Sequence, residues 1–135
     1  PKAFVYHKRR IDWNKFYIQV NKFGMVRPIL NKWHPGTAKS TYWFPTLFML
    51  GLAAAIILAI IELWLPLLLY VFYFSILFLD ALIRNKDVKV AILAIYAALT
   101  QFMGYGMGFF KSTMLLNFST KEVEELFPKL FFKKK

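Results

Sequence analysis

The chain is too short and too apolar to enclose its hydrophobic side chains in a core of its own. Its 135 residues are 59% hydrophobic and 19% aromatic, and they carry a net charge of +11. A charge of this sign suits nucleic acid or the anionic face of a membrane. Because the cations flank long apolar runs, we expect membrane lipids as partners and no nucleic acid. The chain has no cysteine, which excludes disulfides and thiolate chemistry.

The first ten residues, PKAFVYHKRR, are an apolar stretch that ends in a histidine and three cations. This pattern predicts the end of a strand and a basic turn. With no initiator Met, signal peptide or polar lead-in, we expect residues 1–10 to be the end of an upstream domain. Two interpretations of His7 stay open: an incidental histidine in a positive-inside anchor, or an imidazole offered to a metal or phosphate, with Lys8, Arg9 and Arg10 neutralising phosphate charge.

Residues 11–42 predict a helix and a connector. From Ile11 to Phe23 the apolar and the polar side chains each recur at helical spacing. One stripe holds Phe16, Val20 and Phe23, and the other holds Lys15, Gln19 and Lys22. Such a helix suits the headgroup boundary of a membrane, where it lies flat; a surface helix of a soluble domain is the alternative. Gly24 and Arg27-Pro28 are expected to weaken or end it.

Three apolar runs, at about 43–63, 65–83 and 88–110, predict transmembrane helices. At about 1.5 Å per residue, each run matches the roughly 30 Å of hydrocarbon in a bilayer. If all three cross, the cations place the N-terminus in the cytoplasm. If the third run dips in and returns, every cation is cytoplasmic, and this alternative stays open. At the end of the second run, Asp80 and Arg84 are spaced to form an ion pair.

The third run ends in a glycine-rich stretch, QFMGYGMGFF. Gly104 and Gly108 form a small-xxx-small pair, so they and their neighbours Gln101 and Tyr105 are candidates for close helix packing. A role in ligand binding is the alternative. Residues 112–135 predict an amphipathic basic tail, in which a capping box at Ser119 starts a short helix over 120–127.

Nothing in the chain points to catalysis by these residues alone. The seven acidic residues form no Asp-x-Asp metal clamp and no pair suited to acid and base work. There is also no glycine-rich phosphate loop and no Ser-His-Asp or Cys-His arrangement.

Several segments together resemble the C-terminal part of membrane-bound family 2 glycosyltransferases, in particular the succinoglycan-biosynthesis-like branch common in Bacteroidetes. The segments are VYHKRR (residues 5–10), FYIQVNKFGMVR (residues 16–27), His34-Pro35, Pro45 and QFMGYGMGF (residues 101–109). The similarity covers nearly the whole chain up to about Phe110. It implies a multi-pass protein of a bacterial inner membrane with a GT-A catalytic domain upstream of this chain.

The resemblance further implies transfer of a sugar from a nucleotide sugar to a lipid-linked or polysaccharide acceptor, with a divalent cation, Mg or Mn, as cofactor. It places His7, as a metal ligand, with Arg9 and Arg10 at the edge of the diphosphate and metal. Gln19, Gly24 and Arg27 would then belong to the interface helix that bridges the catalytic domain and the bilayer. The basic stripe of that helix, Lys15, Lys22 and Arg27, would attract the acceptor phosphate. The nucleotide-binding half and the catalytic base are not in this sequence.

The predicted fold is therefore an all-α membrane protein: an amphipathic interface helix, three transmembrane helices, and a short strand remnant of a GT-A domain. A homo-oligomer is possible. The alternative function is a small non-enzymatic membrane subunit that scaffolds a larger complex. The intact mass of the protein isolated from membranes distinguishes the two, because only the enzyme requires an upstream catalytic domain.

Overall fold

The computed structural model describes residues 12–131, which contain helices and no strand. The elements in chain order are α1 (Trp13–Trp33), the 3₁₀ turns η1 (Pro35–Thr37) and η2 (Ser40–Trp43), α2 (Phe44–Ile60), α3 (Leu65–Asn85), α4 (Val88–Phe118) and α5 (Val123–Leu126). Three helical segments are each long and apolar enough to cross a membrane: η2 joined to α2, then α3, and then α4. These features agree with the predicted all-α membrane class. The predicted strand remnant at 1–10 lies outside the described residues.

α1 is longer than the sequence predicts. Asp12 caps its first turn by accepting a hydrogen bond from the Asn14 amide at 2.8 Å. The expectation that Gly24 or Pro28 would end the helix is wrong, since α1 continues to Trp33. Both residues are buried, and we attribute the continuation to tertiary packing, which overrides the weak local preference against glycine and proline.

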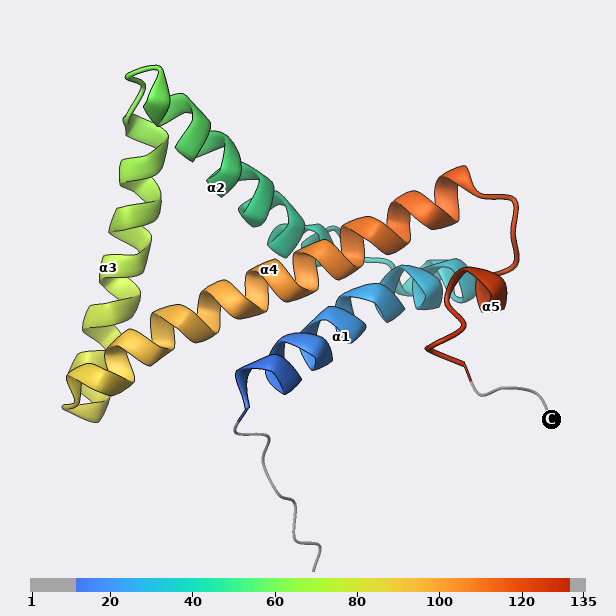
Figure 1. The fold of residues 1–135 in the computed structure, drawn as a ribbon, viewed down its shortest axis with the longest axis horizontal. Helices are drawn as coiled ribbons and strands as arrows, with labels where there is room; N and C mark the ends of the chain where they lie inside the picture. The colour runs from blue at the N-terminus through green and yellow to red at the C-terminus, as the bar shows by residue number, and fades with distance from the viewer. Residues whose placement is uncertain (1–11, 132–135) are drawn as a thin grey trace, which may run out of the picture.

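α2, α3 and the first half of α4 outline a triangle, whose apex is the turn between α2 and α3 (Figure 1). Near the base of α2, the Tyr70 hydroxyl donates to the Phe48 carbonyl at 3.0 Å and links α3 to α2. α2 contacts α4 at Thr46. α3 is connected to α4 by the turn at Lys86, whose backbone is left-handed (φ 53°). Ala81 is the one buried residue of α3. Most of the apolar surface of the triangle is therefore exposed, as it is in helices that face lipid.

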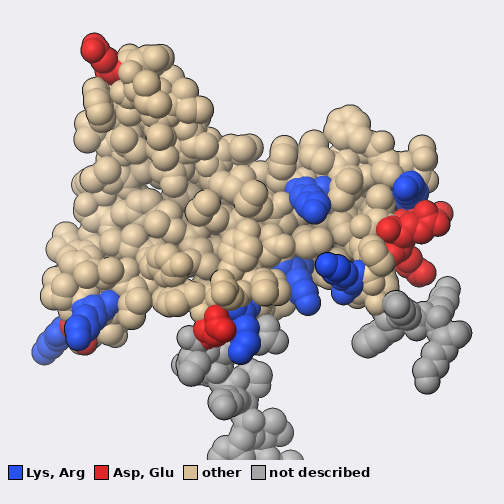
Figure 2. Space-filling model, viewed as in Figure 1, with Lys and Arg blue, Asp and Glu red and all other residues tan. Residues whose placement is uncertain are grey.

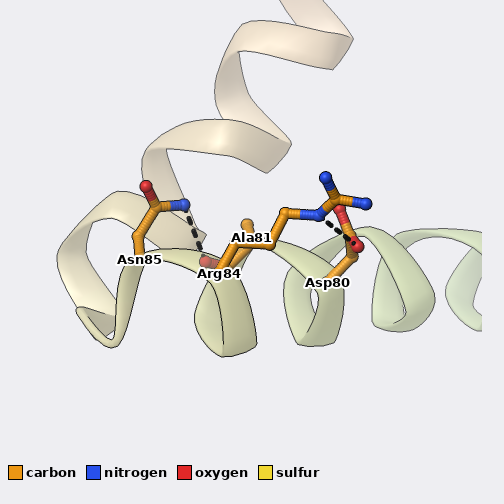
Figure 3. Close-up of polar contacts among 4 residues, drawn as sticks. All are labelled: Asp80, Ala81, Arg84 and Asn85. Carbon is orange, nitrogen blue, oxygen red and sulfur yellow. Dashed lines mark hydrogen bonds and ion pairs between the residues drawn. The ribbon is translucent and has the colours of Figure 1, made fainter.

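The corner between α3 and α4 gathers charged groups. The Arg84 Nε donates to Asp80 Oδ1 at 2.7 Å, and the Asn85 side-chain amide donates to the Ala81 carbonyl at 2.8 Å (Figure 3). The predicted ion pair is thus confirmed. Two residues further on, Asp87 caps α4 by accepting from the Lys89 amide at 2.7 Å.

α4 extends eight residues beyond the predicted end at 110 and includes the start of the predicted tail. Its second half runs beside α1 in the same direction (Figure 1). The chain then folds back, so that Val123 and Phe127 pack on Ile29 in a small core. The predicted capping box is wrong in detail: α5 begins at Val123, and the Ser119 hydroxyl accepts from the Lys121 amide at 3.2 Å instead of capping a helix at 120.

Candidate functional site

Glycines bring the backbones of α1 and α4 into direct contact. A Cβ atom added at Gly24 would collide with the Tyr105 carbonyl oxygen and would lie 2.9 Å from the Phe109 nitrogen. A Cβ atom added at Gly108 would collide with the Asn21 carbonyl oxygen. Both obstacles are backbone atoms of the opposite helix, so neither can be relieved by a side-chain rotation. The two helices can approach this closely only because these positions have no side chain.

Gly104, the other glycine of the predicted packing pair, also faces α1. The Asn21 side-chain amide donates to the Gly104 carbonyl at 2.9 Å, and a Cβ atom at Gly104 would lie 3.3 Å from the Tyr17 ring. Gly106 faces the other way, towards α2, where the buried Thr46 hydroxyl donates to its carbonyl at 3.1 Å. The GYGMG stretch therefore holds α1 on one side of α4 and α2 on the other.

Arg27 connects three elements of the fold. Its guanidinium lies 4.3 Å from the centre of the Tyr42 ring in η2, a cation-π contact. Arg27 and Tyr105 of α4 also line a common pocket of about 320 Å³. The predicted acceptor residue Arg27 and the predicted packing residue Tyr105 are thus brought together, although 78 positions separate them in the sequence.

Three lysines from different elements line one pocket, which we call the lysine pocket. They are Lys22 of α1, Lys111 of α4 and Lys129 of the C-terminal segment. The pocket has a volume of about 370 Å³, and the remaining described residues of its lining are mainly apolar and aromatic, with Asn21 and the Tyr17 hydroxyl as further polar groups and no acidic residue among them. Three lysines in the lining of a mainly apolar pocket suit a ligand that carries both a phosphate and a hydrocarbon part.

The sequence predicts one member of the lysine pocket, Lys22, and misses the other two. Lys111 follows the apolar run directly and Lys129 lies in the tail, where no motif marks either residue. The signal that could have found Lys111 is its spacing from the glycine pair: it lies three residues after Gly108 and thus on the side of α4 that faces α1.

A second polar pocket, of about 360 Å³, lies between the C-terminal ends of α1 and α4. It is lined by Asn31, Lys32, Thr113 and Asn117 among apolar residues that include Trp43. The side-chain oxygen of Asn31 is buried and has no hydrogen-bond partner within the described residues.

Other predicted site residues do not join these pockets. Lys15 is exposed and forms a long ion pair with Asp12, at 3.8 Å. Gln19 is half-buried and Gln101 is exposed. The structure therefore divides the predicted acceptor residues: Lys22 and Arg27 lie at pockets, whereas Lys15 and Gln19 do not.

The predicted metal and diphosphate residues, His7, Arg9 and Arg10, lie outside the described residues. Between residues 12 and 131, no three His, Asp or Glu side chains lie close enough together to hold a metal ion.

No family model matches the chain, and neither a curated protein nor a solved structure is significantly similar to it.

Proposed function

We propose that this chain is the membrane-anchoring C-terminal part of a family 2 glycosyltransferase, which transfers a sugar from a nucleotide sugar to a lipid-linked or polysaccharide acceptor at the cytoplasmic face of a bacterial inner membrane. The observation that supports this best is the packing between residues 16–27 and 101–109. These are two of the segments that carry the resemblance, and their glycines, Arg27 and Tyr105 meet in one interface.

In this proposal the lysine pocket receives the phosphate of the acceptor. Lys22, Lys111 and Lys129 supply positive charge without a competing carboxylate in the lining. The apolar part of the pocket accommodates the first carbons of the lipid chain, and α1 lies at the headgroup boundary as the interface helix. The role of these residues is to bind and orient the acceptor.

Catalysis itself belongs to the upstream domain. The nucleotide sugar, the divalent cation and the catalytic base would be held there, with His7, Arg9 and Arg10 at its edge. When bound, the cation would neutralise charge on the diphosphate leaving group. The described residues provide the anchor and the acceptor site.

Sugar transfer in membranes that contain the full-length protein tests the proposal. The probes are radiolabelled nucleotide sugars, and the readouts are label in the lipid and polymer fractions and, separately, hydrolysis of the donor. Reversing the charge of both pocket lysines, in a Lys22→Glu and Lys111→Glu double variant, removes charge-assisted contacts worth about 1.5 to 3 kcal/mol each. We expect transfer to fall at least about tenfold, with donor hydrolysis retained.

The matched control is Lys89→Glu, which reverses an exposed lysine at the opposite end of α4. It should leave transfer unchanged. If the control loses as much transfer as the pocket variant, the effect comes from overall charge and not from the pocket. If no nucleotide sugar labels any fraction and the intact mass shows no upstream domain, the scaffold subunit is the correct function.

A further inference from the structure

The position of α1 beside α4 constrains how α4 can sit in a membrane. α1 begins next to the first third of α4, where the Trp13 and Tyr96 rings lie 4.5 Å apart. From there the two helices run in the same direction, through the contact of Gly24 with Tyr105. α4 is long and apolar enough to cross a bilayer, but α1 is not. Any membrane position of the second half of α4 must therefore suit α1 as well.

A crossing α4 would carry α1 into the hydrocarbon. The charge-free part of α4, between Lys89 and Lys111, is the part that a crossing would immerse, and α1 lies beside it from Tyr96 onward. Lys15 is exposed on α1 beside this part of α4, whereas Lys22 lies level with its end, where it lines one pocket with Lys111. Lys15 would cost about 2.5 to 3.5 kcal/mol at the centre of a bilayer, and the first-turn amides of α1 that have no partner within the helix would add to that cost.

The charges are instead compatible with an α4 that lies along one membrane surface. Arg84, Lys86 and Lys89 lie at its first end, and Lys111 and Lys121 lie towards its other end. In Figure 2 the Lys and Arg side chains lie at the α3–α4 corner, along the edge where α1 lies, and towards the far end of α4, away from the turn between α2 and α3. The turn between α2 and α3 carries Glu62 and no Lys or Arg.

The dimensions of the triangle allow the α2–α3 hairpin to cross alone. At 1.5 Å per residue, the α2 side of the triangle, from Thr46 to Ile60, is about 21 Å long, and the α3 side is about 30 Å long. The α4 side, from Val88 to Gly106, is about 27 Å long. A triangle with these sides has its apex about 20 Å from the α4 axis. A surface helix buries its apolar face about 5 to 10 Å into the headgroup and acyl boundary, so its axis lies about 0 to 5 Å below that boundary. The apex then lies about 20 to 25 Å below the boundary, which is most of the roughly 30 Å thickness of the hydrocarbon.

We propose that α1 and α4 lie together along one anionic membrane surface, with α1 on the water side, and that within residues 12–131 only the α2–α3 hairpin crosses the bilayer. Residues on both sides of the hairpin, including α5, then share one face of the membrane. Glu62 alone among the described charged residues reaches the opposite face. The arrangement keeps every described cation at an anionic headgroup surface, where each contributes about 1 kcal/mol of attraction.

Cysteine accessibility in the full-length protein, in native membranes, tests this arrangement. This chain has no cysteine, so single probes at Lys39→Cys, Glu62→Cys and Lys121→Cys introduce unique thiols in it. A membrane-impermeant maleimide is added to one side of the membrane and then to the other. We expect the probes at 39 and 121 to react from the same side and the probe at 62 from the opposite side. Reaction of the probes at 62 and 121 from one side would overturn the proposal.

A second pair of probes measures depth and does not depend on the loops. Lys15→Cys lies beside the charge-free part of α4, and Ile57→Cys lies in α2; both positions are exposed to the surroundings of the protein. The probe at 15 should react from the same side as the probe at 39, and the probe at 57 should stay unreactive from either side because it faces lipid. An unreactive probe at 15 would show that α1 is immersed and would overturn the proposal. Neither result depends on sugar transfer.

Discussion

The α1–α4 interface and the α2–α3 hairpin achieve stability in different ways. In the interface, backbone meets backbone at Gly24 and Gly108, and polar side chains cross between the helices. In the hairpin, the contacts are made by aromatic side chains, such as the Phe48 and Tyr70 rings at 4.9 Å, and α3 buries only Ala81. The interface is a fixed structural unit, whereas the hairpin depends on lipid to cover its surface.

The glycines of the two regions show this difference most directly. At Gly24 and Gly108 an added methyl group would meet backbone atoms of the other helix, whereas at Gly51 in α2 it would meet the Tyr70 hydroxyl, at 2.5 Å. A backbone atom cannot move without its helix, but a tyrosine hydroxyl is the far end of a side chain. The same substitution should therefore have different effects in the two regions.

The largest expected effect comes from Gly24→Ala and Gly108→Ala. Each forces α1 and α4 apart, and we expect each to lower the free energy of unfolding by about 3 kcal/mol, at the upper end of the cost of overpacking. The loss should occur although alanine forms helices better than glycine by about 1 kcal/mol. Thermal unfolding of the full-length protein in lipid nanodiscs measures the change.

Gly51→Ala and Gly36→Ala are the matched controls. The first should be nearly neutral, since Tyr70 can shift, and the second should have no effect, because nothing lies within 4 Å of the added atom. If Gly51→Ala is as damaging as Gly108→Ala, the hairpin is packed as rigidly as the interface and the contrast between the two regions is wrong.

An intermediate effect is expected where the two regions join, at Thr46. Its buried hydroxyl donates to the Gly106 carbonyl across the α2–α4 contact. Thr46→Val keeps the shape and removes this bond, which should cost about 1 kcal/mol of unfolding free energy. Thr100→Val is the control, because the Thr100 hydroxyl bonds the Tyr96 carbonyl of its own helix, at 2.8 Å. Equal losses in both variants would show that the contact does not hold the hairpin to α4.

The sequence predicts the helices of this fold better than their ends. Apolar runs locate α2, α3 and α4, because lipid imposes a minimum length and a near absence of charge. The same rule cannot find the last eight residues of α4, which are stabilised by α1 and by the core at Ile29 and Val123. Local rules also fail at Gly24 and Pro28, where a nearby helix compensates for a poor helix former.

The candidate site is harder to predict than the fold. The spacing of Gly104 and Gly108 identifies a packing face, but it does not identify the partner helix. Lys22, Lys111 and Lys129 come from three elements, and nothing in the linear sequence relates them. Their convergence depends on the parallel packing of α1 and α4 and on the return of the chain after α4.

The smallest expected effect is at the charged corner, and its size tests where that corner lies. The side chains of Arg84 and Asp80 are 75% and 53% exposed, and an exposed pair of this kind contributes less than about 1 kcal/mol in water. At a headgroup surface, where water reaches Asp80, Arg84→Ala should change the free energy of unfolding in nanodiscs by no more than that. Arg84→Lys, which keeps the charge, should be indistinguishable from the native protein. A loss near 3 kcal/mol, which is the cost of a charged residue within hydrocarbon, would instead mean that the corner is immersed. In that case α4 could not lie along the membrane surface with its first end in contact with water.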